Sequence, residues 1–372
     1  MAAKMRKKHK TKENNFALLV PFCGDFLSQN KMTSEILAKV IRGDTVESIH
    51  RGHIVVIDGG GNVVASVGDP STVTFFRSAA KAFQAMPCIT SGAADAFGFA
   101  DDEIAMACAS HSGESMHVER IARMLAKIGL AESDLRCGVH MPFNEAEAER
   151  MIRAGEKPNQ LHNNCSGKHA AMLAFAKYTG ADIKTYESPE NPTQKAIFSC
   201  VADFTEIPED EIHIGIDGCA APNFAVPVSA MAKSFINLIS PSKFDADTQN
   251  ACSRIVTASM KYPELIGGTG RLDTLIMQTA PGKIISKVGA DGVWLCGVLP
   301  SDKWPTGLGI AIKVEDGDDY RGRPVIAVEI LRQLGVLGAD DLSDLSPSMI
   351  KNRRGDIVGK IIPWLDLLGH GR

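Results

Sequence analysis

The sequence predicts an α+β fold in which the N- and C-terminal halves contribute strands to one antiparallel sheet and an α-rich subdomain packs against it. Strand-like segments occur near both ends of the chain, between about residues 36 and 67 and again after residue 283. The middle, about residues 75–280, instead carries apolar residues at helical spacing. Strands from both ends around a helical middle can close a single sheet. We expect the functional site at the seam between sheet and helices.

The N-terminal strands predict a β-hairpin. His53–Asp58 and Val63–Val67 are rich in β-branched residues and are separated by the turn Gly59-Gly60-Gly61-Asn62. The glycines do not form a Gly-x-Gly-x-x-Gly pattern, so the turn interpretation is preferred to a nucleotide-binding loop.

Helical spacing and capping signals divide the middle of the chain into successive helices. After Asp69-Pro70 the chain is predicted to enter a long helical region that includes Ser78 and continues through Ile104–Ala109. A helix from Val118 to Ile128 stops at Gly129, and Asn191-Pro192 supplies an N-cap and a first-turn proline for another. Further helices are expected over residues 145–152, 161–180, 230–238, 249–260 and 272–277, with one strand at 213–217.

The C-terminal part returns to strands. Four are predicted, with one covering helix at Pro324–Leu334: the strands are Lys283–Lys287, Val293–Val298, Leu308–Lys313 and Val358–Ile362.

The composition is that of an ordinary globular protein, with 44% hydrophobic and 23% charged residues in a chain of 372. A formal net charge of -4 gives the folded body no attraction to nucleic acid or to an anionic membrane. No apolar run approaches the roughly 18 residues that span a bilayer. We therefore expect neither a nucleic-acid nor a membrane partner.

Residues 1–30 are predicted to be a basic tail of uncertain order, and residues 31–372 a single catalytic domain. The lysines and arginine of the tail are not followed by the apolar segment and cleavage site of a signal peptide. A solvated charge run is favoured over a basic arm that contacts acidic partners.

Cysteine usage gives a further expectation about the compartment. The nine cysteines are an odd number, are spread evenly and include no Cys-x-x-Cys. That pattern is not a disulfide framework, so we expect reduced thiols and a cytoplasmic protein.

Ser78 and Lys81 are the first candidates for catalysis. Residues three apart on a helix share a face, so the Ser78 hydroxyl and the Lys81 amine can meet without help from another segment. The serine is a weak nucleophile unless a base takes its proton, and a lysine can do so only when burial or a cationic neighbour keeps it neutral. The pattern indicates a nucleophile beside its base.

The Ser-x-x-Lys pattern alone is weak evidence because the chain contains it four times, also at Ser28, Ser240 and Ser348. Only the Ser78 copy lies among small and apolar residues that could desolvate the lysine, whereas polar residues or prolines surround the others. A partly exposed helix lysine is the alternative for Lys81.

Two further segments carry unusual chemistry. Ser110-His111-Ser112-Gly113-Glu114 separates two predicted helices, although a plain helix cap also explains its serines. Residues 161–170 place Cys165 and Lys168 on one helix face, and Cys219 lies in another small-residue turn. Two thiolates could begin a zinc site, but lysine is a rare ligand, and buried inert cysteines remain the alternative.

Gly267-Gly268-Thr269-Gly270 precedes the predicted helix from Leu272. Such a glycine-rich helix start is suited to presenting backbone N–H groups to a carboxylate.

Together these residues resemble the asparaginase II family, the Rhizobium-type or class 3 L-asparaginases, whose fold is similar to serine β-lactamases and penicillin-binding proteins. The resemblance runs from about Lys39 to the C-terminus. It depends on a set of short motifs: Arg51-Gly52-His53, Arg77-Ser78-Ala79-Ala80-Lys81, residues 110–114, Asn164-Cys165-Ser166-Gly167-Lys168-His169, Asp217-Gly218-Cys219 and Gly289-Ala290-Asp291-Gly292.

The resemblance implies roles for individual residues. Ser78 with Lys81 would form one Ser-Lys pair, and Ser110 with Lys287 a second. It also implies a zinc site of Cys165, Lys168 and Cys219, and a homodimer. The residues expected to bind substrate are Arg77, His111, Asn163, Asp217, Gly268 and Thr269.

The activity that the resemblance implies is hydrolysis of L-asparagine to L-aspartate and ammonia. The alternatives are a Ser-Lys amidase for another amide, such as glutamine or a peptidoglycan-like amide, and a catalytically inactive zinc-binding relative. A β-lactamase is disfavoured because Ser-Asp is followed by Leu135 and Leu345 rather than asparagine, and Lys-Thr-Gly does not occur.

Overall fold

The computed structural model describes residues 34–369, which fold into two sheets and a set of helices. The strands are β1 (Glu35–Arg42), β2 (Thr45–Asp58), β3 (Val63–Val67), β4 (Val73–Phe75), β5 (His213–Ile216), β6 (Pro222–Pro227), β7 (Ile284–Val288), β8 (Val293–Val298), β9 (Leu308–Val314), β10 (Ser348–Lys351) and β11 (Ile357–Pro363). The α-helices are α1 (Lys81–Thr90), α2 (Ala93–Ala96), α3 (Asp101–Ala107), α4 (Ser115–Lys127), α5 (Glu145–Ala154), α6 (Ser166–Thr179), α7 (Pro192–Thr205), α8 (Val228–Ile239), α9 (Ala246–Lys261), α10 (Pro263–Ile266), α11 (Leu272–Thr279) and α12 (Gly322–Gln333).

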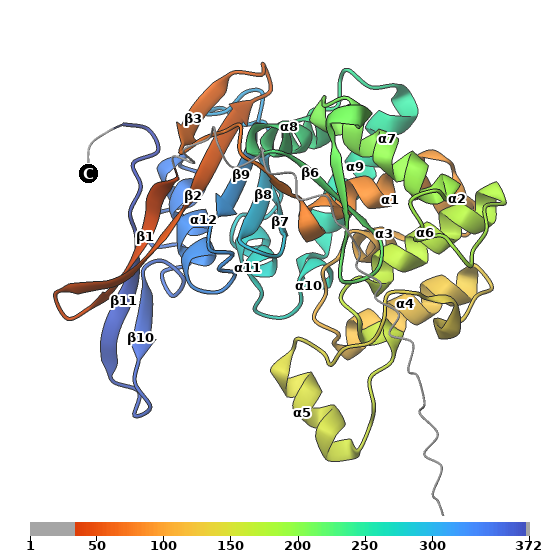
Figure 1. Cartoon of the computed structure of the whole chain (residues 1–372), viewed down its shortest axis with the longest axis horizontal. Coiled ribbons are helices and arrows are strands. Elements are labelled where there is room, and N and C mark those ends of the chain that lie inside the picture. The colour runs from red at the N-terminus through yellow and green to blue at the C-terminus, as the bar shows by residue number, and fades with distance from the viewer. Residues whose placement is uncertain (1–33, 370–372) are drawn as a thin grey trace, which may run out of the picture. The chain divides into compact units, whose positions relative to one another are not determined.

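The large sheet joins the two ends of the chain, as the sequence predicts. Its strands run in the order β10-β11-β1-β2-β9-β8-β7, and β3 also pairs with β2. The pairings are antiparallel, and the central one joins Val55 of β2 to Ala311 of β9. The helices from α1 to α9 gather beside this sheet, as Figure 1 shows. The predicted α+β class, with its sheet from both halves and its α-rich subdomain, is therefore confirmed.

Side chains alternate between the two faces of the sheet, and both faces are covered. Val55 and Ala311 belong to the core shared with the helical part, whereas Ile54 and Ile312 belong to a second core that includes residues of α12. Because successive side chains point to opposite faces, a strand covered on both sides is apolar throughout. That is why every residue of β8 is buried.

Gly309 lets α8 lie close to β9. A Cβ atom added at this glycine would lie 2.1 Å from the carbonyl oxygen of Ala232, which no real side chain can tolerate. The absence of a side chain therefore brings the backbone of α8 directly onto the sheet.

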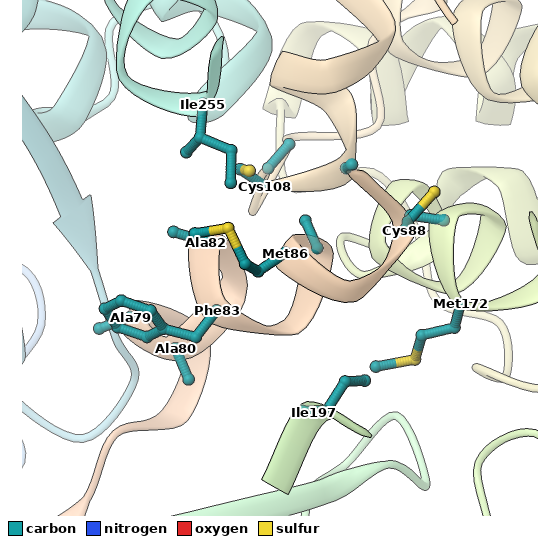
Figure 2. Close-up of a cluster of buried hydrophobic side chains, with 14 of the residues drawn as sticks. Ala79, Ala80, Ala82, Phe83, Met86, Cys88, Cys108, Met172, Ile197 and Ile255 are labelled. Atoms are coloured by element: carbon teal, nitrogen blue, oxygen red, sulfur yellow. The ribbon is translucent and has the colours of Figure 1, made fainter. Parts of the chain in front are cut away.

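Helix α1 is the centre of the helical part. Its side chains Phe83 and Met86 are buried, and they pack in one cluster with Met172 of α6, Ile197 of α7 and Ile255 of α9 (Figure 2). The Phe83 ring also meets neighbouring aromatic rings. This packing fixes the start of α1, where the candidate catalytic pair lies.

Besides β6, for which no strand was predicted, two short strands were predicted differently or missed. Residues 73–75, expected to belong to a helical region, form β4, which pairs with β6 in a small sheet of order β4-β6-β5. The missed strand β10 pairs with β11. In both cases the hydrogen-bonding partner is remote or the strand is very short, so local patterning gives little signal.

The predicted basic tail, residues 1–30, lies outside the described residues, and the division into tail and single catalytic domain stays a prediction. The described residues, 34–369, fall within one compact unit. Among residues 34–369, no helix combines the length and hydropathy needed to cross a membrane.

Candidate active site

Ser78 and Ser110 line the same cavity, which has a volume of about 310 Å³. Ser78 is the second residue of a 3-10 helix, η1 (Arg77–Ala80), which leads directly into α1. Ser110 follows α3, and its N–H donates to the carbonyl of Ile266. The fold thus brings together two serines from separate helices, as the sequence predicts for the seam.

Lys81 lies beneath Ser78 and is almost completely buried, with 1% of its surface exposed. Its Nζ donates to the carbonyl oxygens of Ala109 at 2.6 Å and Asn164 at 2.9 Å. Burial lowers the pKa of Lys81, the thiols of Cys165 and Cys219 opposing the shift. No hydrogen bond joins Ser78 to Lys81 within residues 34–369.

Ser110 and Lys287 form a direct pair across 177 positions of sequence. The Lys287 Nζ, from strand β7, donates to the Ser110 Oγ at 2.9 Å and to the Val288 carbonyl oxygen at 2.9 Å. Burial lowers the pKa of Lys287 to about 7; Asp273 opposes the shift and the charge of Lys81 adds to it. A lysine with such a pKa can accept or donate a proton near neutral pH.

Asp273 is a buried carboxylate that the sequence analysis did not select. Its Oδ2 lies 3.8 Å from the Lys287 Nζ and accepts the N–H of Val288, while its Oδ1 accepts from the Ser286 hydroxyl. Ser286 in turn accepts from the Trp294 indole. The network holds strand β7 and its lysine in place. Its only local signal is an acidic residue in the first turn of α11.

Arg77 stands beside Ser78 in an unusual backbone conformation. Its φ of +52° lies in the left-handed region, which a non-glycine residue adopts at a cost. Its N–H donates to Asn223 Oδ1, and its guanidinium pairs with Asp217 at 3.1 Å and with Asp291. Arg77 and Asp217 both line the cavity, so the structure brings these two predicted substrate-binding residues together.

Asn163 is a third predicted substrate-binding residue that lines the cavity. Its amide group donates to the carbonyls of Cys137 and Gly138, and its Oδ1 accepts the N–H of Cys165. The side chain is thus fully engaged in shaping the loop before α6. Any contact with a substrate would be additional to these bonds.

The other three predicted substrate-binding residues do not line the cavity. His111 is fully buried, lies 3.0 Å from the Ser166 hydroxyl and accepts the N–H of Gly113. Thr269 gives both its N–H and its hydroxyl to Glu114, and Gly268 packs against Ser112. These residues support the loop that carries Ser110, and their predicted contact with substrate stays a prediction.

Cys165, Lys168 and Cys219 converge at one end of the cavity. The Lys168 Nζ donates to the Cys219 Sγ at 3.1 Å, and all three side chains are buried. The hydrogen bond that the Cys165 thiol donates to Cys219, helped by the Lys168 cation, holds the pKa of Cys219 well below its usual range. The same hydrogen bond and burial raise the pKa of Cys165. A thiolate beside a second thiol is a donor set that suits zinc.

Lys168, the third residue of the proposed zinc site, is an unusual metal ligand. Burial lowers the pKa of Lys168, but the nearby Cys219 and Cys165 sulfurs outweigh it and the net shift is upward. Lys168 therefore carries a proton that it must lose to bind a metal. Among residues 34–369, no group of three or more His, Cys, Asp or Glu side chains could hold a metal ion.

Several residues that line the cavity were not predicted from the sequence. His140 and Phe143 stack with ring centroids 4.5 Å apart on the wall before α5. Arg271, Tyr320 and Arg323 also line the cavity. They lie in loops or on a helix whose local pattern is ordinary, so only the tertiary structure identifies them.

Two serines line one cavity: Ser110 is hydrogen bonded to the buried Lys287, and Ser78 lies three residues before the buried Lys81. This arrangement is that of a serine–lysine hydrolase. The family of these hydrolases follows from the sequence comparison. The model of the L-asparaginase II family matches residues 38–363, and the chain therefore belongs to that family, a family of amidohydrolases. No curated protein sequence matched the chain.

Solved structures of low sequence identity also matched. A probable glutaminase from Bacillus subtilis, complexed with 6-diazo-5-oxo-L-norleucine, shows 12% identity over 77% of this chain and 85% of its own, with a TM-score of 0.38. A carbapenemase from Vibrio cholerae shows 14% identity over 75% and 94%, with a TM-score of 0.33. A β-lactamase from Sphaerobacter thermophilus shows 12% identity over 78% and 93%, with a TM-score of 0.40.

Proposed function

We propose that the protein hydrolyses L-asparagine to L-aspartate and ammonia. Family membership supports an amide substrate. The observation that carries the proposal is that Ser78 and Ser110 line one cavity, each near a buried lysine. Such a cavity has room for a small amide and supplies two separate groups for two proton transfers.

In the first step the Ser78 Oγ attacks the side-chain carbonyl of asparagine while Lys81 accepts its proton. A neutral amine has two N–H bonds and one lone pair. The two donors of Lys81 are taken by the carbonyls of Ala109 and Asn164, which leaves the lone pair for the Ser78 proton. In the first turn of η1 the N–H groups of Arg77 and Ala79 are already bonded, to Asn223 and to the Phe76 carbonyl, so the N–H of Ser78 itself would stabilise the oxyanion.

In the second transfer the proton that Lys81 has accepted is relayed through Lys287 and Ser110 to the leaving nitrogen. The carbon–nitrogen bond breaks, ammonia leaves, and an ester on Ser78 remains. Water then attacks this ester while the neutral Ser110–Lys287 pair takes its proton. The bond between the acyl carbon and the Ser78 Oγ breaks, the proton passes to that oxygen, and aspartate is released with the Ser78 hydroxyl restored. The direct hydrogen bond of 2.9 Å between Lys287 and Ser110 makes this pair suited to the relay.

Arg77 and Asp217 would hold the ends of the amino acid. Asparagine carries an α-carboxylate and an α-ammonium group, which match a guanidinium and a carboxylate. Both side chains line the cavity and already pair with each other. On binding, the substrate carboxylate would therefore replace Asp217 as a partner of Arg77, and the substrate ammonium group would replace Arg77 as a partner of Asp217.

Zinc at Cys165, Lys168 and Cys219 is part of the proposal. The convergence of two sulfurs and one amine supports it. Zinc held there would supply a fixed positive charge that helps to position the substrate. The serine and lysine steps above do not depend on it.

One observation favours the opposite order of the two serines. Ser110 is hydrogen bonded to its lysine, whereas Ser78 is not bonded to Lys81. Catalytic hydrogen bonds are often long before substrate binds, which is why Ser78 is kept as the nucleophile. Accumulated acyl-enzyme can be located by peptide mass spectrometry, and a label on Ser110 would reverse the order.

The substrate is tested by ammonia release from asparagine and glutamine with the wild-type protein. We expect Ser78→Ala and Lys81→Ala each to lower kcat by at least about 1000-fold while the protein stays folded. Ser240→Ala changes a serine of the same Ser-x-x-Lys pattern far from the cavity and is the control. Release from glutamine alone would favour the alternative amide. A folded wild-type protein without release would favour an inactive relative.

A further inference from the structure

A second cavity of about 170 Å³ adjoins the first. The two share a wall formed by Ser110, Val288 and Tyr320 together with three charged residues, Arg271, Asp319 and Arg323. Beyond this wall the second cavity is lined by Gly267, Gly270, Asp273 and four apolar side chains: Leu272 and Leu275 of α11, Pro324 of α12 and Leu345 of the loop before β10. None of these four residues lines the first cavity.

Ser110 lies at the boundary, while Ser78 lines only the first cavity. The Ser110–Lys287 pair faces the leaving nitrogen in the reaction proposed above. A substituent on that nitrogen would therefore extend past Ser110 into the second cavity. Asparagine itself, whose leaving group is ammonia, has no atoms to place there.

The size and lining of the second cavity indicate what it would hold. An apolar cavity of about 150 Å³ is large enough to bind benzene. Four aliphatic or proline side chains beyond the shared wall favour an apolar ring over a polar group. A cationic substituent would pass Arg271 and Arg323. Two carboxylates line the second cavity, but Asp319 is already bound to Arg323, and Asp273 already accepts the Ser286 hydroxyl and the Val288 N–H.

We propose that the enzyme also hydrolyses secondary β-amides of L-aspartate whose leaving amine carries a flat apolar group, such as a benzyl group. This inference rests on the proposed function. The Ser78 Oγ bonds to the amide carbon, the carbon–nitrogen bond breaks, and the benzylamine leaves with a proton from the Ser110–Lys287 pair. Water hydrolyses the ester, so one water is consumed and aspartate and benzylamine are formed.

The test measures amine release by the wild-type protein from three substrates: asparagine, its Nδ-benzyl derivative and its Nδ-(2-aminoethyl) derivative. We expect kcat/KM for the benzyl amide to lie within about 100-fold of that for asparagine and at least about tenfold above that for the aminoethyl amide. Ammonia from asparagine without benzylamine from the benzyl amide overturns this inference alone. Failure with asparagine overturns the proposed function.

Two substitutions that change the size of the second cavity in opposite directions test whether the substituent binds there. Leu275→Trp fills it and should lower kcat/KM for the benzyl amide at least about tenfold, with less than about a twofold change for asparagine. Leu345→Ala enlarges it and should raise acceptance of a bulkier naphthylmethyl amide. Leu130→Trp, at a half-buried leucine outside both cavities, is the control. Equal losses on both substrates in Leu275→Trp, together with no gain in Leu345→Ala, overturn the assignment.

Discussion

At the scale of single residues, the site depends on how differently the surroundings of its three buried lysines shift their pKa values. Lys81 donates to two neutral carbonyls, and its pKa is lowered by burial. Lys287 has the Asp273 carboxylate 3.8 Å away, yet burial still lowers its pKa to about 7. Lys168, beside the sulfur of Cys219, is instead held in its charged form. The same side chain is therefore suited to three proposed roles, and only its surroundings differ: Lys81 as a base, Lys287 as a proton relay and Lys168 as a counter-ion to the Cys219 sulfur.

The relay lysine sets an expectation for pH dependence. A lysine pKa lowered to about 7 leaves Lys287 neutral above that pH and charged below it. Because the free enzyme needs neutral lysines to take serine protons, kcat/KM for asparagine should rise as pH increases through about 7. In the residual activity of Lys287→Met the limb should move to higher pH, because Lys81 must still be neutral and has lost the repulsion of a neighbouring cation. A wild-type profile that is flat between pH 5 and 9 would contradict the role given to Lys287.

The cysteines set an expectation for zinc. Cys165→Ala and Cys219→Ala should each lose zinc in elemental analysis of the folded protein, because a site with so few ligands cannot spare one. Activity should weaken mainly through KM. Cys88→Ala, at an equally buried cysteine of α1, should keep the metal content of the wild type. If both ligand variants match this control, the two cysteines are core residues.

At the scale of elements, the turn from β4 through η1 into α1 places the nucleophile. The N–H of Phe76 donates to the carbonyl of Phe224, and the N–H of Arg77 donates to Asn223, so strand β6 holds both residues of the turn. The left-handed conformation of Arg77 then turns the chain so that Ser78 reaches the cavity. Behind it, the buried side chains of α1 leave no freedom to move.

This turn gives a prediction in which glycine is more stabilising than alanine, the reverse of their usual order in helices. Arg77→Gly and Arg77→Ala lose the same ion pairs with Asp217 and Asp291, but only glycine adopts a positive φ without steric cost. Arg77→Gly should therefore be the more stable variant by about 1 kcal/mol in urea unfolding. Both should lose activity, mainly through KM. An alanine variant as stable as the glycine variant would show that the turn relaxes.

At the scale of the whole molecule, the site forms where the sheet meets the helices. Lys287 comes from β7 of the large sheet, Ser110 follows α3, and Cys219 lies between β5 and β6 of the small sheet. Their side chains meet because α1, α3 and α6 pack beside the sheet, and each is fixed by a different part of the core. Such a site is preorganised by packing that is complete before substrate binds.

The family resemblance also leads us to propose a homodimer. Light scattering on the purified protein should give about twice the 39.9 kDa of one chain. Since dimers dissociate on dilution, the measured mass should be followed over a range of concentrations, with a protein of known dimer mass as control. One chain mass at every concentration would contradict the expectation. A cytoplasmic location stays a prediction from cysteine usage.

The sequence by itself determined the strand–helix–strand order, the hairpin of β2 and β3 and the N-cap at Asn191. Each depends on neighbours within a few positions, where periodicity, capping and turn chemistry act. Motifs further apart were linked through the resemblance, which the family match then confirmed.

Only the tertiary structure decided which groups meet and what charge they carry. The Ser110–Lys287 hydrogen bond and the Asp273 network span distances along the chain that no local pattern encodes. Whether Thr269 faces a substrate or Glu114 depends on how two loops pack. The lowered pKa values of Lys81 and Lys287 come from desolvation, and desolvation exists only once other segments have closed over a side chain.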